Sequence, residues 1–487
     1  MKRPLIPLIL VSASVVIPGP IRAQSDPPEP TVIVLHPAGE PTPALKYTLL
    51  PEPRELLPGN AAIFYHRALH LLLETQMAQE RQARSEGRDQ PERTEANIID
   101  WIDRPLGEIP VDEAREQLDL YGRVLREVEL GALREDCDWE FDRRPESIDL
   151  LLPEVQSSRS LARLVSLRVR LAILDGDVDA AVHWLRTGYA LARHVSDGPS
   201  LIQSLVGLAI GGVMNGDLIE LIQLEGTPSL YWAIAHLPDP VVDMSAGLVG
   251  ERSLVDRLIP ELRELEGPPW SVEQARRFVE DLGRSLSGLS GQAEFDRWTT
   301  GLGLTALFAR AYPDAKRSLI EGGMPEAEVE AMPVAQVVGL VSYRRNRELS
   351  DDLYKWMDIP YPQAYRPIQE TYEGFTVEQK LSDPGVVLFE MLRPYLLGVK
   401  MAEVRADRQL AALRCVEAIR LFAASHDGQL PPSLDAIAEV PLPLDPATGE
   451  PFSYAVDGDT ATLSAPLIPG GPDHPAYRID YQLRLAD

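Results

Sequence analysis

The chain has 487 residues, 45% of them hydrophobic and 25% charged, which is enough for roughly two to four globular domains with buried cores. Its formal net charge is -27, whereas nucleic-acid binding requires lysine and arginine side chains that neutralise phosphates. The charge therefore excludes the usual nucleic-acid-binding classes, and we expect no nucleic-acid partner.

The N-terminus has the organisation of a secretory signal peptide. A basic start, Met1 to Arg3, precedes an apolar stretch over 5–17, and Ala23 is a small residue suited to a cleavage site. The apolar stretch is shorter than a bilayer-spanning helix requires. We predict a signal peptide over 1–23 and an exported protein, periplasmic or extracellular, with an uncleaved N-terminal anchor as the alternative.

Residues 24–58 form a proline-rich segment. It contains nine prolines, each of which fixes φ and lacks a backbone donor. We predict an extended leader here, in which 31–35 and 45–50 are candidate edge strands lying along the body of the protein.

From residue 59 to 395 the apolar residues follow helical spacing. The clearest early examples are 60–84 and 111–133, and no sustained alternation typical of strands occurs before the C-terminus. Prolines between 220 and 375 suit the first turns of further helices. We predict an irregular multi-helix body over 59–395, so that the fold is mainly α.

One helical hairpin stands out over 158–195. Leucines spaced by three and four residues lead to a turn at Asp175, Gly176 and Asp177, and the same spacing then continues. The turn and the small residue Gly188 resemble a single tetratricopeptide-type (TPR-like) αα-hairpin. No second copy follows at the repeat spacing, so we expect a lone hairpin, not a repeat array.

The most apolar internal stretch, 201–214, contains Gly207 and Gly211. At 14 residues it is shorter than a membrane span. We therefore predict a close-packed buried helix and no transmembrane span in the mature chain.

The C-terminal part, 396–487, combines helix and strand patterns. A long helix is expected over 396–424, and Asp457-Gly458 between two alternating runs predicts a β-hairpin. Residues 477–483 alternate cleanly and predict a last strand with one buried face. We predict a small α+β module with an antiparallel sheet.

Two connections in this module carry a family resemblance. His426-Asp-Gly-Gln-Leu-Pro-Pro-Ser-Leu434 follows the long helix, and Asp445-Pro-Ala-Thr-Gly-Glu-Pro-Phe-Ser-Tyr454 leads into the sheet. Over 405–487 the order resembles the C-terminal half of type II secretion pseudopilins and type IV pilin-like proteins, which implies a similar small fold. The chain lacks their peptidase site followed by a long apolar helix, so pilus assembly is not implied.

The whole chain also resembles a group of large exported bacterial proteins of unknown function. The matching stretches are 56–69, 137–139, 188–212 and the C-terminal module. This resemblance implies a helical body with such a module and no particular activity.

His66, His70 and Glu74 are the candidate metal ligands. Their spacing of four residues places them on one helix face, where a zinc ion could bind. The alternative is a half-buried face with hydrogen-bonded imidazoles, because the order differs from the His-Glu-x-x-His arrangement. We therefore predict no metal site. If a metal ion does bind, these three residues are the best candidates for its ligands.

Two acidic groups are candidate calcium ligands, with solvated turns as the alternative in both cases. The first group surrounds Cys137 and Trp139, and the second lies in turns of the C-terminal module. Cys137 and Cys415 are either buried thiols or a disulfide. The acidic residues are Glu135, Asp136, Asp138, Glu140 and Asp142 in the first group, and Asp445, Asp457 and Asp459 in the second.

No sequence motif for nucleophilic catalysis, nucleotide binding or another cofactor is present, so we predict no catalytic residue and no cofactor. We predict a non-catalytic exported helical scaffold or binding protein of the cell envelope, whose candidate partner is another envelope protein. The alternatives are a metal-dependent or other hydrolase with an unrecognised site, and an accessory protein of a pilin-like secretion system. No oligomeric state follows from the sequence.

Overall fold

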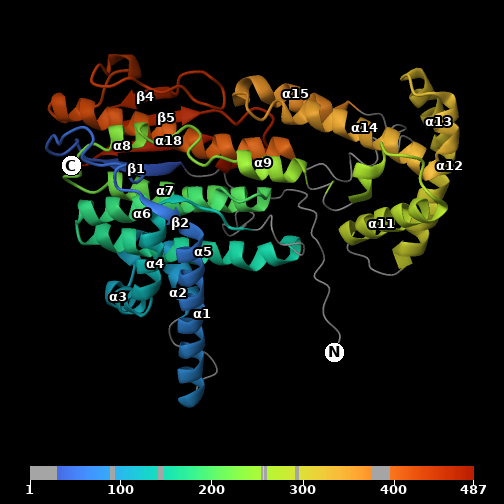
Figure 1. The fold of residues 1–487 in the computed structure, drawn as a ribbon. Coiled ribbons are helices and arrows are strands. Elements are labelled where there is room, and N and C mark those ends of the chain that lie inside the picture. Colours follow the sequence, from blue (N-terminus) through green and yellow to red (C-terminus); the bar gives the residue numbers. More distant parts are fainter. Residues whose placement is uncertain are drawn as a thin grey trace. The chain divides into compact units, whose positions relative to one another are not determined.

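A computed structural model describes residues 30–87, 94–140, 147–253, 256, 260–290, 295–374 and 395–486. These residues are mainly helical, with a small C-terminal antiparallel sheet, as predicted (Figure 1). They form two compact units. The larger unit comprises Arg22–Leu248 with Met401–Asp487, and the smaller comprises Val249–Lys400, so residues 59–395 contribute to both.

The larger unit begins with helices predicted from apolar spacing. The predicted helix over 60–84 is confirmed, but the predicted helix over 111–133 is two helices, because the backbone leaves the helical region at the fully buried Tyr121. The helices are α1 (Ala61–Ser85), α2 (Glu95–Ile102), α3 (Val111–Leu120) and α4 (Gly122–Ala132), with a 3-10 turn, η1 (Leu106–Glu108).

The predicted αα-hairpin is confirmed as α5 (Ser147–Leu174) and α6 (Val178–Ser196). Gly176 supplies the positive φ of the turn, +71°, which most side chains disfavour. Asp177 then caps α6 by accepting a hydrogen bond from the Ala180 backbone N–H. The turn chemistry therefore fixes where one helix stops and the next begins.

Helix α7 (Leu201–Ile222) packs tightly against α6, which agrees with the predicted close-packed helix. A Cβ built on Gly207 would lie 2.6 Å from the Ala192 carbonyl oxygen. The helix extends beyond the 14-residue apolar stretch, to 22 residues. Among the described residues, it alone is long and apolar enough to cross a membrane, and 61% of its apolar window is buried inside the protein.

The sheet of the larger unit has the order β1-β6-β5-β4. The edge strand predicted over 31–35 is confirmed, and it pairs parallel to β6, whereas β4, β5 and β6 are antiparallel neighbours. The strand predicted over 45–50 is wrong, because Tyr47 and Leu49 are buried individually in an irregular segment. The strands are β1 (Thr31–Leu35), β4 (Ser453–Asp457), β5 (Thr460–Ala465) and β6 (Ile479–Leu485).

The long C-terminal helix, α18 (Leu396–Ser425), is confirmed, and its residues from 401 onward are largely buried. The hairpin turn at Gly458 is also confirmed, with φ +59°. Tyr477 lies in a 3-10 turn before β6, while the alternating residues Ile479, Tyr481 and Leu483 are buried. Short elements complete this unit: β2 (Leu57–Asn60), β3 (Arg134–Asp136), α8 (Tyr231–Ala235), η4 (Leu434–Ala436) and η5 (Pro475–Tyr477).

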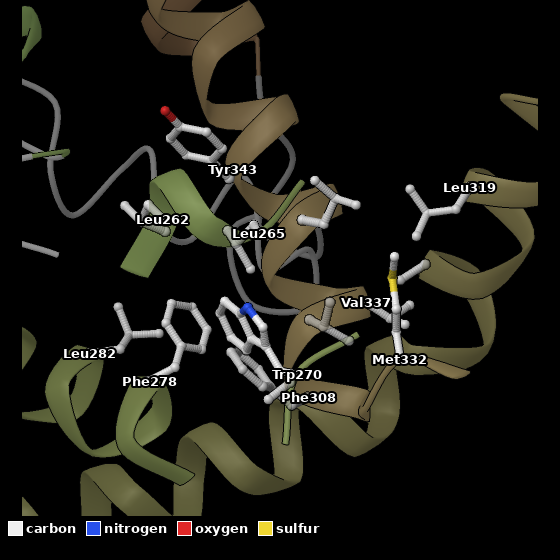
Figure 2. Close-up of a cluster of buried hydrophobic side chains, with 14 of the residues drawn as sticks. Leu262, Leu265, Trp270, Phe278, Leu282, Phe308, Leu319, Met332, Val337 and Tyr343 are labelled. Atoms are coloured by element: carbon white, nitrogen blue, oxygen red, sulfur yellow. The ribbon is translucent and has the colours of Figure 1, made fainter. Parts of the chain in front are cut away.

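Helix α9 (Ser245–Arg252) runs from the larger unit into the smaller one, which has its own aromatic core. Trp270 meets Phe278 edge to face at 5.3 Å between ring centroids, and Phe308 lies 6.4 Å from Phe278 (Figure 2). Its elements are η3 (Pro260–Glu264), α11 (Val272–Ser290), α12 (Phe295–Glu321), α13 (Glu326–Ala331), α14 (Val334–Tyr354) and α15 (Tyr361–Glu373).

Candidate functional site

The start of α1 contacts the loop after β3, which carries part of the first acidic group. Asn60 caps α1 by accepting a hydrogen bond from the Ala62 N–H at 3.0 Å. Its amide also donates to the Asp138 carbonyl oxygen at 2.7 Å and accepts from the Asp138 N–H at 3.0 Å. One side chain therefore fixes both the helix start and the acidic loop.

Beneath this loop, an aromatic and polar cluster joins α1 to α6. The Tyr65 hydroxyl lies 2.7 Å from Nδ1 of His194, and the Trp139 indole donates to the His194 carbonyl oxygen at 2.7 Å. The Tyr65 and Trp139 rings stack at 5.9 Å between centroids. Trp139 is buried, so its side chain anchors the loop in the core of the unit.

Burial controls the protonation of this cluster. It raises the pKa of the Tyr65 phenol well above its ordinary value, and it raises the pKa of the Cys137 thiol. Burial, with a smaller contribution from the Arg193 charge, lowers the pKa of His194 to about 4. All three groups are therefore neutral near pH 7, and the Tyr65 hydroxyl and His194 Nδ1 are joined by a hydrogen bond between uncharged groups.

This protonation pattern is typical of a cluster that stabilises the structure, and not of a catalytic centre. A nucleophilic cysteine requires a lowered thiol pKa, and Cys137 has the opposite shift. A general base works best with a pKa near the operating pH, which the His194 value of about 4 does not meet. Cys137 and Cys415 are both free thiols, so they do not form a disulfide.

The three candidate metal ligands on α1 do not converge. His66 lies edge-on to the Trp139 ring at 5.4 Å between centroids. His70 Nε2 instead lies 3.2 Å from a Glu74 carboxylate oxygen, and both side chains are exposed. Across the described part of the chain, no group of three or more His, Cys, Asp or Glu side chains is placed to hold a metal ion.

The first acidic group is organised by turn geometry. The Asp138 carboxylate accepts a hydrogen bond from the Glu140 N–H at 2.8 Å, and Glu140 adopts a positive φ of 54°. Asp142 lies outside the described residues. The remaining acidic side chains of this loop, Glu135 and Asp136, are exposed.

The acidic residues of the C-terminal module are separated in role. Asp445 is buried and pairs with Arg408 at 2.7 Å, while its oxygens also accept from the Ala447 N–H and the Thr448 hydroxyl. Asp457 and Asp459 are exposed at the β-hairpin turn. Asp445 therefore holds its turn against α18. Among the described residues it forms no group of metal ligands with Asp457 and Asp459.

A second buried ion pair was missed by sequence reasoning. Arg420 and Glu417 on α18 lie 2.6 Å apart and are fully buried. Arg420 donates to the carbonyl oxygens of His36 and Thr227, and Glu417 accepts from the Leu230 N–H. This pair ties the segment after β1 to α18. The sequence gives no signal for this pair, because α18 carries several other charged residues, among them Lys400, Arg405 and Arg414.

One further buried acid lies between α5 and α7. Asp217 is 3.8 Å from Nη1 of Arg170, and its Oδ2 has no hydrogen-bond partner within the described residues. Burial raises the pKa of Asp217 to about 7, although Ser166 and Arg170 lower it. The carboxyl is inside the helical core and does not open onto a surface site.

The outward face of α1, beside the Tyr65–His194–Trp139 cluster, carries exposed apolar side chains. Ile63, Leu73 and Met77 are each more than half exposed, at 51%, 54% and 51%. The opposite face buries Tyr65 and Leu72 against the rest of the unit. Figure 1 shows the C-terminal half of α1 extending beyond α2 and α3.

Comparisons with protein-family models, with curated proteins and with solved structures find no match to this chain.

Proposed function

We propose that this chain is a non-catalytic, exported scaffold protein of the cell envelope that binds a partner through the outward face of α1. The observation that carries the proposal is the row of exposed Ile63, Leu73 and Met77 on a helix whose other face is buried. Large apolar side chains gathered on one exposed helix face are typical of protein contacts.

The base of α1 supports this role. The Asn60 cap, the Tyr65–His194 hydrogen bond and the stacked Trp139 fix the helix start at three points. A face built on a rigid helix loses little conformational entropy when it binds. The neutral state of Tyr65, His194 and Cys137 favours this structural role for the cluster over catalysis.

Export is supported by the N-terminal sequence, with its basic start, apolar stretch and small residues before position 24. The accessory role in a pilin-like system is less well supported. The outer edge of β6 is occupied by β1 of the same chain, and the residues of α18 from 401 onward are largely buried. Neither surface is available for packing between subunits of a filament.

Cell fractionation tests this proposal. The full chain, Leu73→Glu and Leu120→Glu are produced in a bacterial host, and each is measured in the cytoplasmic, soluble exported and envelope fractions. Leu120 is a matched control, since it is an exposed leucine on a helix of the same unit. We expect the wild type and Leu120→Glu to be retained by the envelope, and Leu73→Glu to move to the soluble exported fraction. Cytoplasmic location, or equal retention of all three, would refute the proposal.

The hydrolase alternative is tested on the same purified protein. Metal analysis of the wild type and of a His66→Ala/His70→Ala variant measures whether these imidazoles hold an ion. We expect no bound metal and similar stability, because His70 is exposed and pairs only with Glu74 in this region. A stoichiometric metal lost in the variant would favour the enzyme.

A further inference from the structure

The outward face of α1 has the spacing of a coiled-coil seam. Its residues follow intervals of three, four, three and four, which place them at the a and d positions of a heptad. Four of the five seam residues are exposed and lie away from the buried face of α1, while His66 is half-buried and packs edge-on to Trp139 of the same chain. The seam residues are Ile63, His66, His70, Leu73 and Met77.

Charged residues of alternating sign run beside the seam. Arg67, Glu74 and Arg81 are seven residues apart, occupy the e positions and are exposed. In an antiparallel pair of identical helices, this column faces its own copy across a two-fold axis. The charges therefore decide which alignment of two copies is attractive.

Two alignments, two heptads apart, pair opposite charges: Arg67 with Glu74, or Glu74 with Arg81. The first brings the whole seam from 63 to 77 into the overlap, whereas the second overlaps only its C-terminal end, so we take the first. With the two-fold axis between residues 71 and 72, Arg67 faces Glu74 of the second copy, and the pair occurs twice. Shifting by one heptad in one direction places Arg67 opposite itself, and shifting in the other places Glu74 opposite itself. Like charges at such positions destabilise a helix pair.

The same alignment also partly covers the exposed apolar side chains of the seam. It places Leu73 against His70 of the second copy and Met77 against His66 of the second copy, so that each apolar side chain meets an imidazole ring. Ile63 lies at the end of the overlap, beside the aliphatic part of Glu80. The seam from 63 to 77 is about 21 Å long, at a rise of about 1.5 Å per residue.

We propose that α1 pairs antiparallel with α1 of a second copy of this chain, with Arg67 opposite Glu74 across a two-fold axis. This inference names a second copy of the chain as the partner of the proposed binding face, with the paired form as the one that the envelope retains, and so it rests on the proposed function. A single helix pair of this length is a small interface, which predicts a dissociation constant on the order of micromolar.

Sedimentation equilibrium of protein purified from the exported fraction tests the pairing. We expect wild-type dimers at concentrations of tens of micromolar, on the order of the predicted constant. Arg67→Glu and Glu74→Arg each convert two attractions into repulsions and should raise the dissociation constant about tenfold. The double variant Arg67→Glu/Glu74→Arg restores opposite charges and should return within about twofold of the wild type. The matched pair Leu73→Glu and Leu120→Glu should be monomeric and dimeric, respectively.

A wild type that stays monomeric at all concentrations would overturn the pairing, as would a double variant as weak as the single ones. These results leave the proposed function distinguishable. If the wild type is monomeric but Leu73→Glu still leaves the envelope fraction, the face binds a different protein and only the pairing fails. If Leu73→Glu changes neither measurement, both fail.

Discussion

Two glycines on α7 offer a matched test of how closely α6 and α7 pack. A Cβ on Gly207 would lie 2.6 Å from the Ala192 carbonyl oxygen and 2.8 Å from Ser196 Cβ. A Cβ on Gly211 would meet only Val242, at an ordinary 3.5 Å. Alanine is preferred to glycine inside a helix by about 1 kcal/mol, and this gain is common to both positions.

The steric cost differs between them. A backbone oxygen cannot rotate away, so Gly207→Ala must push α6 and α7 apart, at a cost of about 3 kcal/mol for overpacking. Subtracting the helix gain leaves a net loss of about 2 kcal/mol for Gly207→Ala, against a gain of up to about 1 kcal/mol for Gly211→Ala. The free energy of unfolding is measured by urea titration with far-UV circular dichroism. Equal stability of the two variants would refute the close approach of the helices.

Three further predictions concern buried polar groups. The raised pKa of Asp217, from 3.8 to about 7, means that folding binds its proton, so wild-type stability should fall as pH rises from about 4 to about 7, by at most about 4 kcal/mol. Asp217→Asn should lack this part of the pH dependence in urea titrations, and identical pH profiles would contradict it. Arg420→Met leaves Glu417 buried without its cation and should lower the unfolding free energy by about 3–5 kcal/mol, whereas no change would show the pair to be solvated. Asn60→Ala loses the cap of α1 and two hydrogen bonds to Asp138, so amide hydrogen exchange over 134–140 should become faster. Unchanged exchange rates would contradict the role of Asn60 in holding this loop.

Local patterns predicted the helices well because each helix has a repeating apolar spacing. The turn at Asp175-Gly176-Asp177 and the hairpin turn at Gly458 were predictable from local sequence as well, because aspartate and glycine favour such turns without help from distant contacts. The break at Tyr121 was not, because it depends on burying one aromatic ring in the tertiary structure. The strand predicted over 45–50 failed because, within the part of the chain that the structure describes, no strand pairs with this segment.

Long-range contacts account for the parts of the site that sequence reasoning missed. His66 and Trp139 were both noted from the sequence, but their contact joins segments more than seventy residues apart. Tyr65 and His194 were missed entirely, because a lone tyrosine and a lone histidine carry no spacing that predicts a hydrogen bond. The parallel pairing of β1 with β6 likewise joins the two ends of the chain.

Site-specific photo-cross-linking from the outward face of α1 tests the central claim most directly. A photoreactive phenylalanine derivative is placed at Leu73, or at Leu120 as the control, in living cells that export the protein, and adducts are identified by mass spectrometry. We predict a protein adduct from position 73 and none of comparable yield from position 120. A position 73 that gives no adduct, or the same adducts as position 120, would contradict the claim that this face binds a partner.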